Sequence, residues 1–115
     1  MIEEFILRYL SERTEHPVSV GRPSPLPTRC YAIEKTDSET KNMISTDTIT
    51  VYSYAPTEYE AASMSKQIRA WMIAMAERPE ICSVKLYTDF SSPDTEVKEP
   101  RYQAIFYVTY YESEV

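Results

Sequence analysis

One long amphipathic segment, residues 57–78, constrains the fold of this chain more than any other stretch. Its apolar residues recur at intervals of three and four positions, which places them on one stripe of an α-helix: Ala61, Met64, Ile68, Trp71 and Met75. Thr57 and Glu60 have the spacing of a capping box, and Pro79 ends the segment because proline lacks the N–H that a helix needs. The stripe must be buried, so the sequence predicts a long helix lying on a sheet.

The segments around this helix predict a second helix and several strands. Residues 1–13 carry apolar side chains at helical spacing and two acidic residues in the first turn, which predicts an N-terminal helix. Four segments have the composition or alternation of strands, namely residues 30–36, 44–54, 82–90 and 101–111, and a brief strand at residues 17–20 is also compatible. Turn-forming residues at 37–42 join the first two of the four into a predicted hairpin.

These elements predict an α+β fold in a single domain, residues 1–115. The expected architecture is a mainly antiparallel sheet of four to five strands with both helices on one face, in the order α-β-β-α-β-β. The composition of 43% hydrophobic and 26% charged residues is typical of a globular protein. No apolar run is long enough to cross a membrane, and the acidic N-terminus is unlike a signal peptide, so we expect a cytoplasmic protein.

Tyrosine is the strongest compositional signal, with ten residues in this short chain. In the last strand, alternation places Tyr102, Ala104, Phe106, Val108 and Tyr110 on one face, and both faces are substantially apolar, which predicts a central strand. The opposite face of the sheet would then carry large side chains that the helices cannot cover: Tyr87, Ile105, Tyr107 and Tyr111. Tyrosine is enriched at protein interfaces, so these four residues are the predicted subunit interface. The alternative is that the rings complete a small core or cover it with hydroxyls in solvent.

The strand at residues 82–90 is expected to direct Cys82, Val84, Leu86 and Phe90 toward the helix, and Tyr87 and Asp89 away from it. Both cysteines, Cys30 and Cys82, are predicted to be buried free thiols, because they are far apart in the sequence and form no Cys-x-x-Cys pair.

Two loops are candidates for contact with a partner. Residues 21–29 contain three alternating prolines, which favour an extended conformation, and residues 91–100 form a longer connection than a hairpin needs. The predicted partner-contact residues are Arg22, Pro23, Pro25 and Pro27 in the first loop, and Pro93, Asp94 and Glu96 in the second. The first loop is then either a surface connector or an arm that reaches a neighbouring subunit.

The residue content argues against several kinds of chemistry. His16 is the only histidine and has no partner at metal-ligand spacing, and the single glycine, Gly21, cannot form a Gly-rich phosphate loop. A net charge of −6 disfavours binding to nucleic-acid phosphates. We therefore predict no catalytic residue, no metal site, no cofactor, no specific nucleic-acid binding and no enzymatic activity.

The chain resembles the small tail-completion or tail-terminator proteins of long-tailed bacteriophages and related prophages. The likeness is carried by Thr48-Ile-Thr-Val-Tyr-Ser-Tyr54 leading into a helix that starts near Glu60-Ala61, and by Pro100-Arg-Tyr-Gln-Ala-Ile-Phe-Tyr-Val-Thr-Tyr110. The short strand and proline-rich loop at residues 18–27 also look like that family.

The resemblance implies a non-catalytic α+β subunit that forms a ring, usually a hexamer, where the tail meets the head. Its partners would be copies of itself, the tail tube and the head connector, and its location would be the virion or the host cytoplasm during assembly. Two alternatives stay open at this point. The chain could be another head–tail connector or minor capsid component, or, in a different class, a small ligand- or peptide-binding module.

Overall fold

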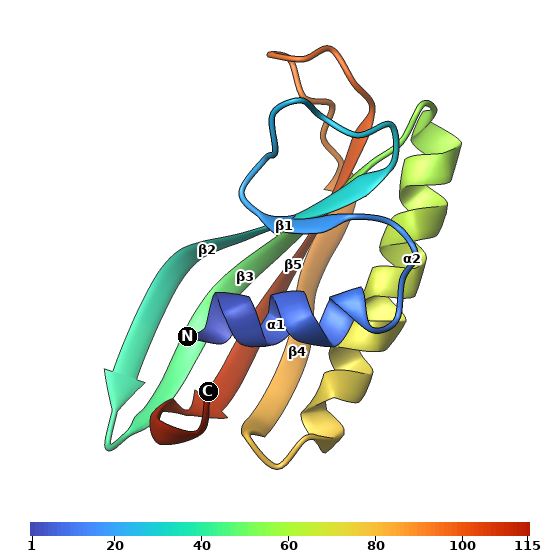
Figure 1. Ribbon diagram of the computed structural model, residues 1–115. Coiled ribbons are helices and arrows are strands. Elements are labelled where there is room, and N and C mark those ends of the chain that lie inside the picture. The colour runs from blue at the N-terminus through green and yellow to red at the C-terminus, as the bar shows by residue number, and fades with distance from the viewer.

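A single curved sheet carries two helices in the computed structural model, which describes residues 1–115 (Figure 1). The elements in chain order are α1 (Ile2–Ser11), β1 (Val18–Val20), β2 (Cys30–Lys41), β3 (Ile44–Tyr54), α2 (Glu58–Ala74), β4 (Ile81–Ser91) and β5 (Arg101–Tyr111). Short 3-10 helices follow α2 at Met75–Glu77 and β5 at Glu112–Glu114. The predicted α+β class is confirmed.

The sheet has five strands in the order β1-β2-β3-β5-β4. β5 lies between β3 and β4, which agrees with the prediction that the last strand is central. Three pairings are antiparallel, but β1 runs parallel to β2, with Val18 opposite Tyr31. The sheet is therefore mixed: the expected antiparallel arrangement holds for three of the four pairings, and the β1–β2 pairing departs from it. The proline-rich loop at residues 21–29 connects β1 to β2 and returns the chain, so that β2 runs in the same direction as β1.

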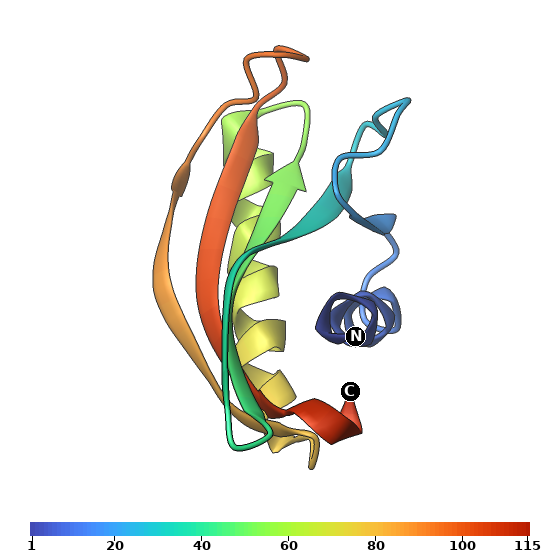
Figure 2. The same ribbon diagram turned by 90° about the vertical axis from the view of Figure 1, so that its left-hand side faces the viewer.

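Both helices lie on one side of the sheet, and the opposite side carries no helix (Figure 2). α2 begins at Thr57, whose hydroxyl accepts a hydrogen bond from the backbone N–H of Glu60 at 3.2 Å. The predicted capping box is only half formed, because the Glu60 carboxylate pairs with Arg29 at 2.8 Å instead of a first-turn N–H. Neither helix has the length and apolar character needed to cross a lipid bilayer.

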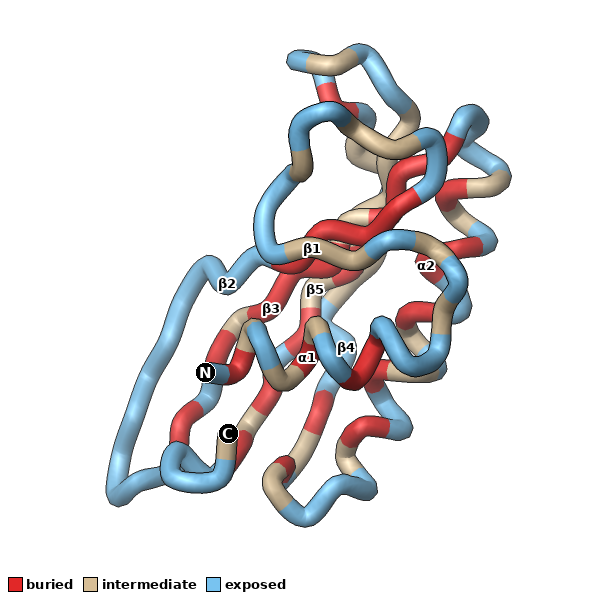
Figure 3. Tube along the Cα trace, in the orientation of Figure 1, coloured by how far each residue is buried: buried red, intermediate tan, exposed pale blue.

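The main core lies between the helices and the sheet, where the buried positions of Figure 3 are concentrated. Its fully buried side chains include Ile6, Leu10, Ile49, Val51, Ile68, Met72 and Phe106. The stripe of the long helix predicts Trp71 in the core, but Trp71 is only half-buried. The next residue, Met72, is fully buried in its place. The Tyr9 hydroxyl donates to the Trp71 carbonyl at 2.8 Å, which ties α1 to α2.

The β2–β3 hairpin is longer than predicted. β2 does not end at residue 36 but continues to Lys41, and the turn consists of Asn42 and Met43, both with positive φ (53° and 65°). Two consecutive positive φ angles are the signature of a type I′ turn, whose twist matches that of the flanking strands. The polar residues at 37–41 fit a strand because this part of β2 is exposed, as the long pale-blue segment in Figure 3 shows.

Two bulges in β4 change which of its side chains face the helices. The register with β5 shifts between Ile81 and Ser83 and again between Leu86 and Thr88. Each bulge adds one residue and reverses the alternation beyond it. The predicted face is therefore wrong at three positions: Cys82 is exposed, Phe90 shares a face with Gln103 away from the helices, and Asp89 lies on the helix side, 3.2 Å from Arg69.

Candidate interaction surfaces

The helix-free face of the sheet has two parts that differ in how they are covered. We call the first the sealed end, formed by Cys30, Ala32 and Tyr54 beneath the loops at residues 21–29 and 91–100. We call the second the open half, formed by Tyr87, Ile105, Tyr107 and Tyr111. The seven predicted partner-contact residues all lie in the loops over the sealed end, and the four predicted interface residues make up the open half.

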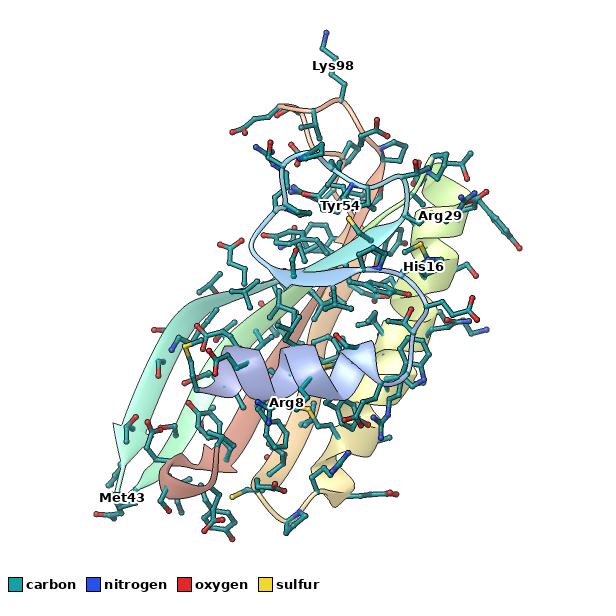
Figure 4. The ribbon with its side chains drawn as sticks, in the orientation of Figure 1. Arg8, His16, Arg29, Met43, Tyr54 and Lys98 are labelled. Carbon is teal, nitrogen blue, oxygen red and sulfur yellow. The ribbon has the colours of Figure 1, made fainter.

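At the sealed end, two loops that are far apart in the sequence meet. Cys30, Ala32 and Tyr54 are each no more than 1% exposed, and Leu26 and Val97 pack against them from the two loops. Figure 1 shows both loops at the same end of the molecule. In Figure 4, Tyr54 lies beneath them and Lys98 extends from the outer loop into solvent. Each loop thus contributes a half-buried apolar residue to this cluster.

Asp94 is the centre of this region and is 4% exposed. Its carboxylate accepts hydrogen bonds from Arg22 at 3.0 Å and from the Tyr54 hydroxyl at 2.9 Å, and its other oxygen accepts from the Glu96 N–H at 3.1 Å. Arg101 lies 3.7 Å away. Burial by itself would raise the pKa of Asp94, but these donors and the Arg101 charge outweigh burial and hold the pKa at about 2.

The surrounding groups complete the same network. Arg22 also pairs with Glu96 at 2.7 Å, and its hydrogen bonds to Glu96 and Asp94 raise its pKa above the ordinary value. Arg101 donates to the Ser92 carbonyl at 2.7 Å and stacks 4.4 Å from the centre of the Tyr52 ring. Burial, reinforced by nearby Glu34, raises the pKa of Tyr52 to about 12. The network therefore fastens the two loops to each other and to the sheet.

A cavity of about 320 Å³ remains between the loops and the sheet. It is lined by charged and aromatic side chains of both loops and of the sheet, among them Arg22, Tyr52, Asp94 and Arg101. Of the prolines predicted to contact a partner, Pro25 and Pro93 are exposed, whereas Pro23 and Pro27 are half-buried. Of the predicted partner-contact residues, Arg22, Pro25, Pro93 and Glu96 are therefore exposed at this end, around the buried Asp94.

In the open half, no loop or helix covers the aromatic side chains. Tyr87 is 62% exposed, Tyr107 is 38% exposed and Tyr111 is 44% exposed, while Ile105 is half-buried. The rings of Tyr87 and Tyr107 lie 5.4 Å apart and are tilted by 51°. The structure thus brings these two predicted interface residues into contact, and it places Ile105 and Tyr111 on the same face of β5 as Tyr107.

Two further apolar residues extend this face and were not predicted from the sequence. Ile44 is 40% exposed and pairs with Tyr111, and Phe90 is 42% exposed and pairs with Gln103. Ile44 could have been found from the register of the hairpin, because it begins a strand next to β5. Phe90 could not, because its position depends on the bulge after Leu86.

A second buried polar network lies on the helix side near the end of the β2–β3 hairpin. Asp47 is fully buried and accepts hydrogen bonds from the Tyr110 hydroxyl at 2.7 Å and the Ser38 hydroxyl at 2.5 Å. Burial, and then the contact with Asp47, raises the pKa of Tyr110 above its ordinary value. Ser45 donates to Glu112 beside it. This network satisfies the buried carboxylate and holds the hairpin against β5.

His16 and the two cysteines also bear on the predictions made from the sequence. The His16 ring lies 6.0 Å from the ring of Tyr31, and no cluster of three or more His, Cys, Asp or Glu side chains could hold a metal ion. Cys30 is buried, as predicted, and burial raises the pKa of its thiol to about 11. Cys82 is exposed, which corrects the prediction that both thiols are buried.

Comparison with other proteins adds no assignment to these surfaces. No family model matches the sequence, and a search of curated proteins finds no similar chain.

Proposed function

We propose that this chain is a structural subunit of a tailed bacteriophage or prophage, of the tail-terminator or tail-completion type. In this role it binds copies of itself in a ring at the head-proximal end of the tail and joins the tail to the head connector. It would act in the virion, and in the host cytoplasm during assembly, without catalysing a reaction. The observation that carries the proposal is the open half of the helix-free face, where Tyr87, Tyr107 and Tyr111 are exposed together.

Exposed aromatic side chains on one face support an assembly role on physical grounds. Each ring offers a large apolar area with a polar tip, so it gains stability when another protein removes it from water. Ile44 and Phe90 lie on the same face and enlarge it. Several exposed apolar residues on one sheet face are typical of a surface that another molecule covers.

The sealed end supports a second contact, with a different partner. Asp94 fixes the loops at residues 21–29 and 91–100, so the exposed Pro25, Pro93 and Glu96 are held in place before a partner binds. A preorganised surface loses less conformational entropy on binding than a mobile loop. We propose that this end faces the tail tube or the head connector.

The net charge of −6 is consistent with a subunit beside a DNA passage. Like charges are disfavoured at close range, so an acidic subunit would not hold DNA as it passes.

One observation favours a different class, a small ligand- or peptide-binding module: the 320 Å³ cavity at the sealed end. Its most buried charged group, Asp94, already has Arg22, Tyr54 and Arg101 as partners, so a ligand would have to displace them. Another head–tail connector component would use the same two surfaces as a tail terminator. It would differ in the particle that it binds.

The test is to measure the mass of the purified chain by light scattering, image it by negative stain, and then incubate it with isolated phage tails lacking their head-proximal cap. We expect rings in solution or on the tail ends. The matched variant is Tyr87→Ser, at an exposed side chain of β4, which should stay folded and form fewer rings.

Rings on connectors but not on tails would move the assignment to a connector component. A chain that stays monomeric at millimolar concentration and binds neither tails nor connectors would overturn the assembly function, and calorimetry with peptides would then test the binding module.

A further inference from the structure

The sheet has one free edge on each side. β1 covers β2 only at Tyr31, Ala32 and Ile33, so residues 34–41 pair with β3 alone and are all exposed. At the other side of the sheet, β4 pairs with β5 alone. A strand edge with unpaired N–H and C=O groups can accept a strand from another chain.

The directions of these two edges are complementary. Three antiparallel pairings separate β2 from β4, so the two strands run in opposite directions within one copy. When two copies stand side by side in the same orientation, β4 of one and β2 of the next are therefore antiparallel. The helices then stay on the same side of the extended sheet, and a head-to-tail contact of this kind can repeat and close into a ring.

The charges on the two edges select a register. With Lys85 opposite Glu39, the neighbouring positions are Ser83 opposite Lys41, Val84 opposite Thr40 and Leu86 opposite Ser38. Glu39 and Lys85 both point to the helix-free face, because Glu39 lies opposite Thr46, Thr46 opposite Thr109 and Lys85 opposite Tyr107. Neither residue forms an ion pair within the chain, so both are free to pair with a second copy.

The bulges on the two strands agree with the same register. Beyond Leu86 the extra residue of β4 is Tyr87, and beyond Asp37 the extra residue of β2 is Thr36. The two insertions compensate one another, so that Asp89 lies opposite Lys35 on the helix side. No like charges face each other in this arrangement.

Symmetric pairing of two β2 edges about the acidic middle of the strand is less favourable. Centring the pair on Ser38 places Asp37 opposite Glu39 twice, and centring it on Glu39 places that carboxylate opposite its own copy. Like charges directly opposite one another destabilise a strand pair.

We propose that residues 34–41 of β2 in one copy add to the β4 edge of a second copy, antiparallel, with Glu39 opposite Lys85. This inference rests on the proposed function, since it specifies the contact through which copies associate. It also makes the open half continuous from one copy to the next, because the extended sheet keeps one helix-free face.

Paired cysteines test the register directly. In a Cys82→Ser background, Glu39→Cys is made in one preparation and Lys85→Cys in another, with tags of different size. The two are mixed and oxidised with diamide, and the products are separated on a non-reducing gel. Directly opposed strand residues lie within disulfide distance, so we expect a heterodimer from the mixture and no dimer from either variant alone. The matched control mixes Lys85→Cys with Glu34→Cys, whose cysteines are out of register and should stay unlinked.

A dimer from Glu39→Cys alone would overturn the proposal in favour of symmetric pairing, and a mixture without heterodimer would overturn it outright. Charge reversal adds a second measurement in solution. Lys85→Glu or Glu39→Lys should raise the concentration needed for association by about tenfold, and the double variant should restore it.

The outcomes separate this inference from the proposed function. Rings that persist unchanged in both charge-reversal variants would refute the β2–β4 contact and leave the assembly function standing. A heterodimer that forms while the chain fails to bind tails or connectors would support the β2–β4 contact and refute the proposed function of joining tails to heads.

Discussion

The two ends of the helix-free face carry similar tyrosines in different surroundings. Tyr54 is 1% exposed, because two loops cover it and Asp94 accepts its hydroxyl hydrogen bond. Tyr107 is on the same face and is 38% exposed, with only Tyr87 beside its ring. The difference shows that this chain covers part of the face with its own loops and leaves the other part uncovered, and we propose that another molecule contacts that part. Four predictions test that contrast, in decreasing order of their effect on the unfolding free energy.

The largest effect is expected for Tyr54→Ala. Removing a fully buried ring leaves a cavity at the sealed end, so we expect the unfolding free energy to fall by about 3–5 kcal/mol. Urea denaturation followed by circular dichroism measures this change. The matched variant is Tyr107→Ala in the open half, which should cost less than about 1 kcal/mol because the ring is partly in water already. Equal losses in the two variants would contradict the division of the face.

Asp94→Ala should have the second largest effect. It leaves the Tyr54 hydroxyl and the Arg22 guanidinium without their buried acceptor, so we expect a loss of about 2–3 kcal/mol. The control is Glu96→Ala, whose side chain is 75% exposed and should contribute about 0.5 kcal/mol or less. If Asp94→Ala unfolded as the wild type does in urea, the loops would be held by something other than this carboxylate.

The stability contributed by Asp94 should depend on pH. Its pKa of about 2 in the folded protein lies below the ordinary value of 3.8, so the fold favours the ionised form. This contribution is fully present above about pH 4 and is lost as the pH falls through about 2. We therefore expect the difference in unfolding free energy between the wild type and Asp94→Asn to shrink over that range. A difference that stays constant would show that the charge of Asp94 is not what stabilises the loops.

The smallest effect on stability is expected for Tyr87→Ser. The side chain is 62% exposed, so the unfolding free energy should change by about 0.5 kcal/mol or less. Association between copies should weaken clearly, because the substitution removes an aromatic group from the open half. Light scattering across a concentration series measures this association. The control is Tyr59→Ser on α2, because Tyr59 is even more exposed and lies outside this face. Equal association of the two variants would remove the open half from the interface.

Sequence periodicity predicted the regular parts of the fold well. The three-and-four spacing in α2 and the alternation in β5 depend only on local geometry, and the structure buries Ile68 and Phe106 as expected. The same alternation predicted the open half. β5 pairs with β3 without a bulge, so Tyr107 lies on the opposite face of the sheet from Phe106, as regular alternation requires. Local rules were sufficient wherever the strand was regular.

Local rules were insufficient where the pairing between strands changes the alternation of side chains. The bulge after Leu86 turned Phe90 outward and Asp89 toward Arg69, and nothing in residues 82–90 taken alone indicates a bulge. The polar residues at 37–41 resembled a turn, but they form an exposed strand because the positive φ angles are adopted later, at Asn42 and Met43. Burial at an edge and the position of a tight turn depend on the partner strand.

By itself, the sequence determined the long capped helix, the hairpin, the central last strand and the aromatic character of the helix-free face, because each of these follows from side-chain spacing along a short stretch. Only the tertiary structure decided which of those aromatics are covered. Arg22 and Asp94 are 72 residues apart in the chain, and their contact seals one end of the face. Such a contact depends on how distant segments are brought together by the sheet, and no local pattern encodes that distance.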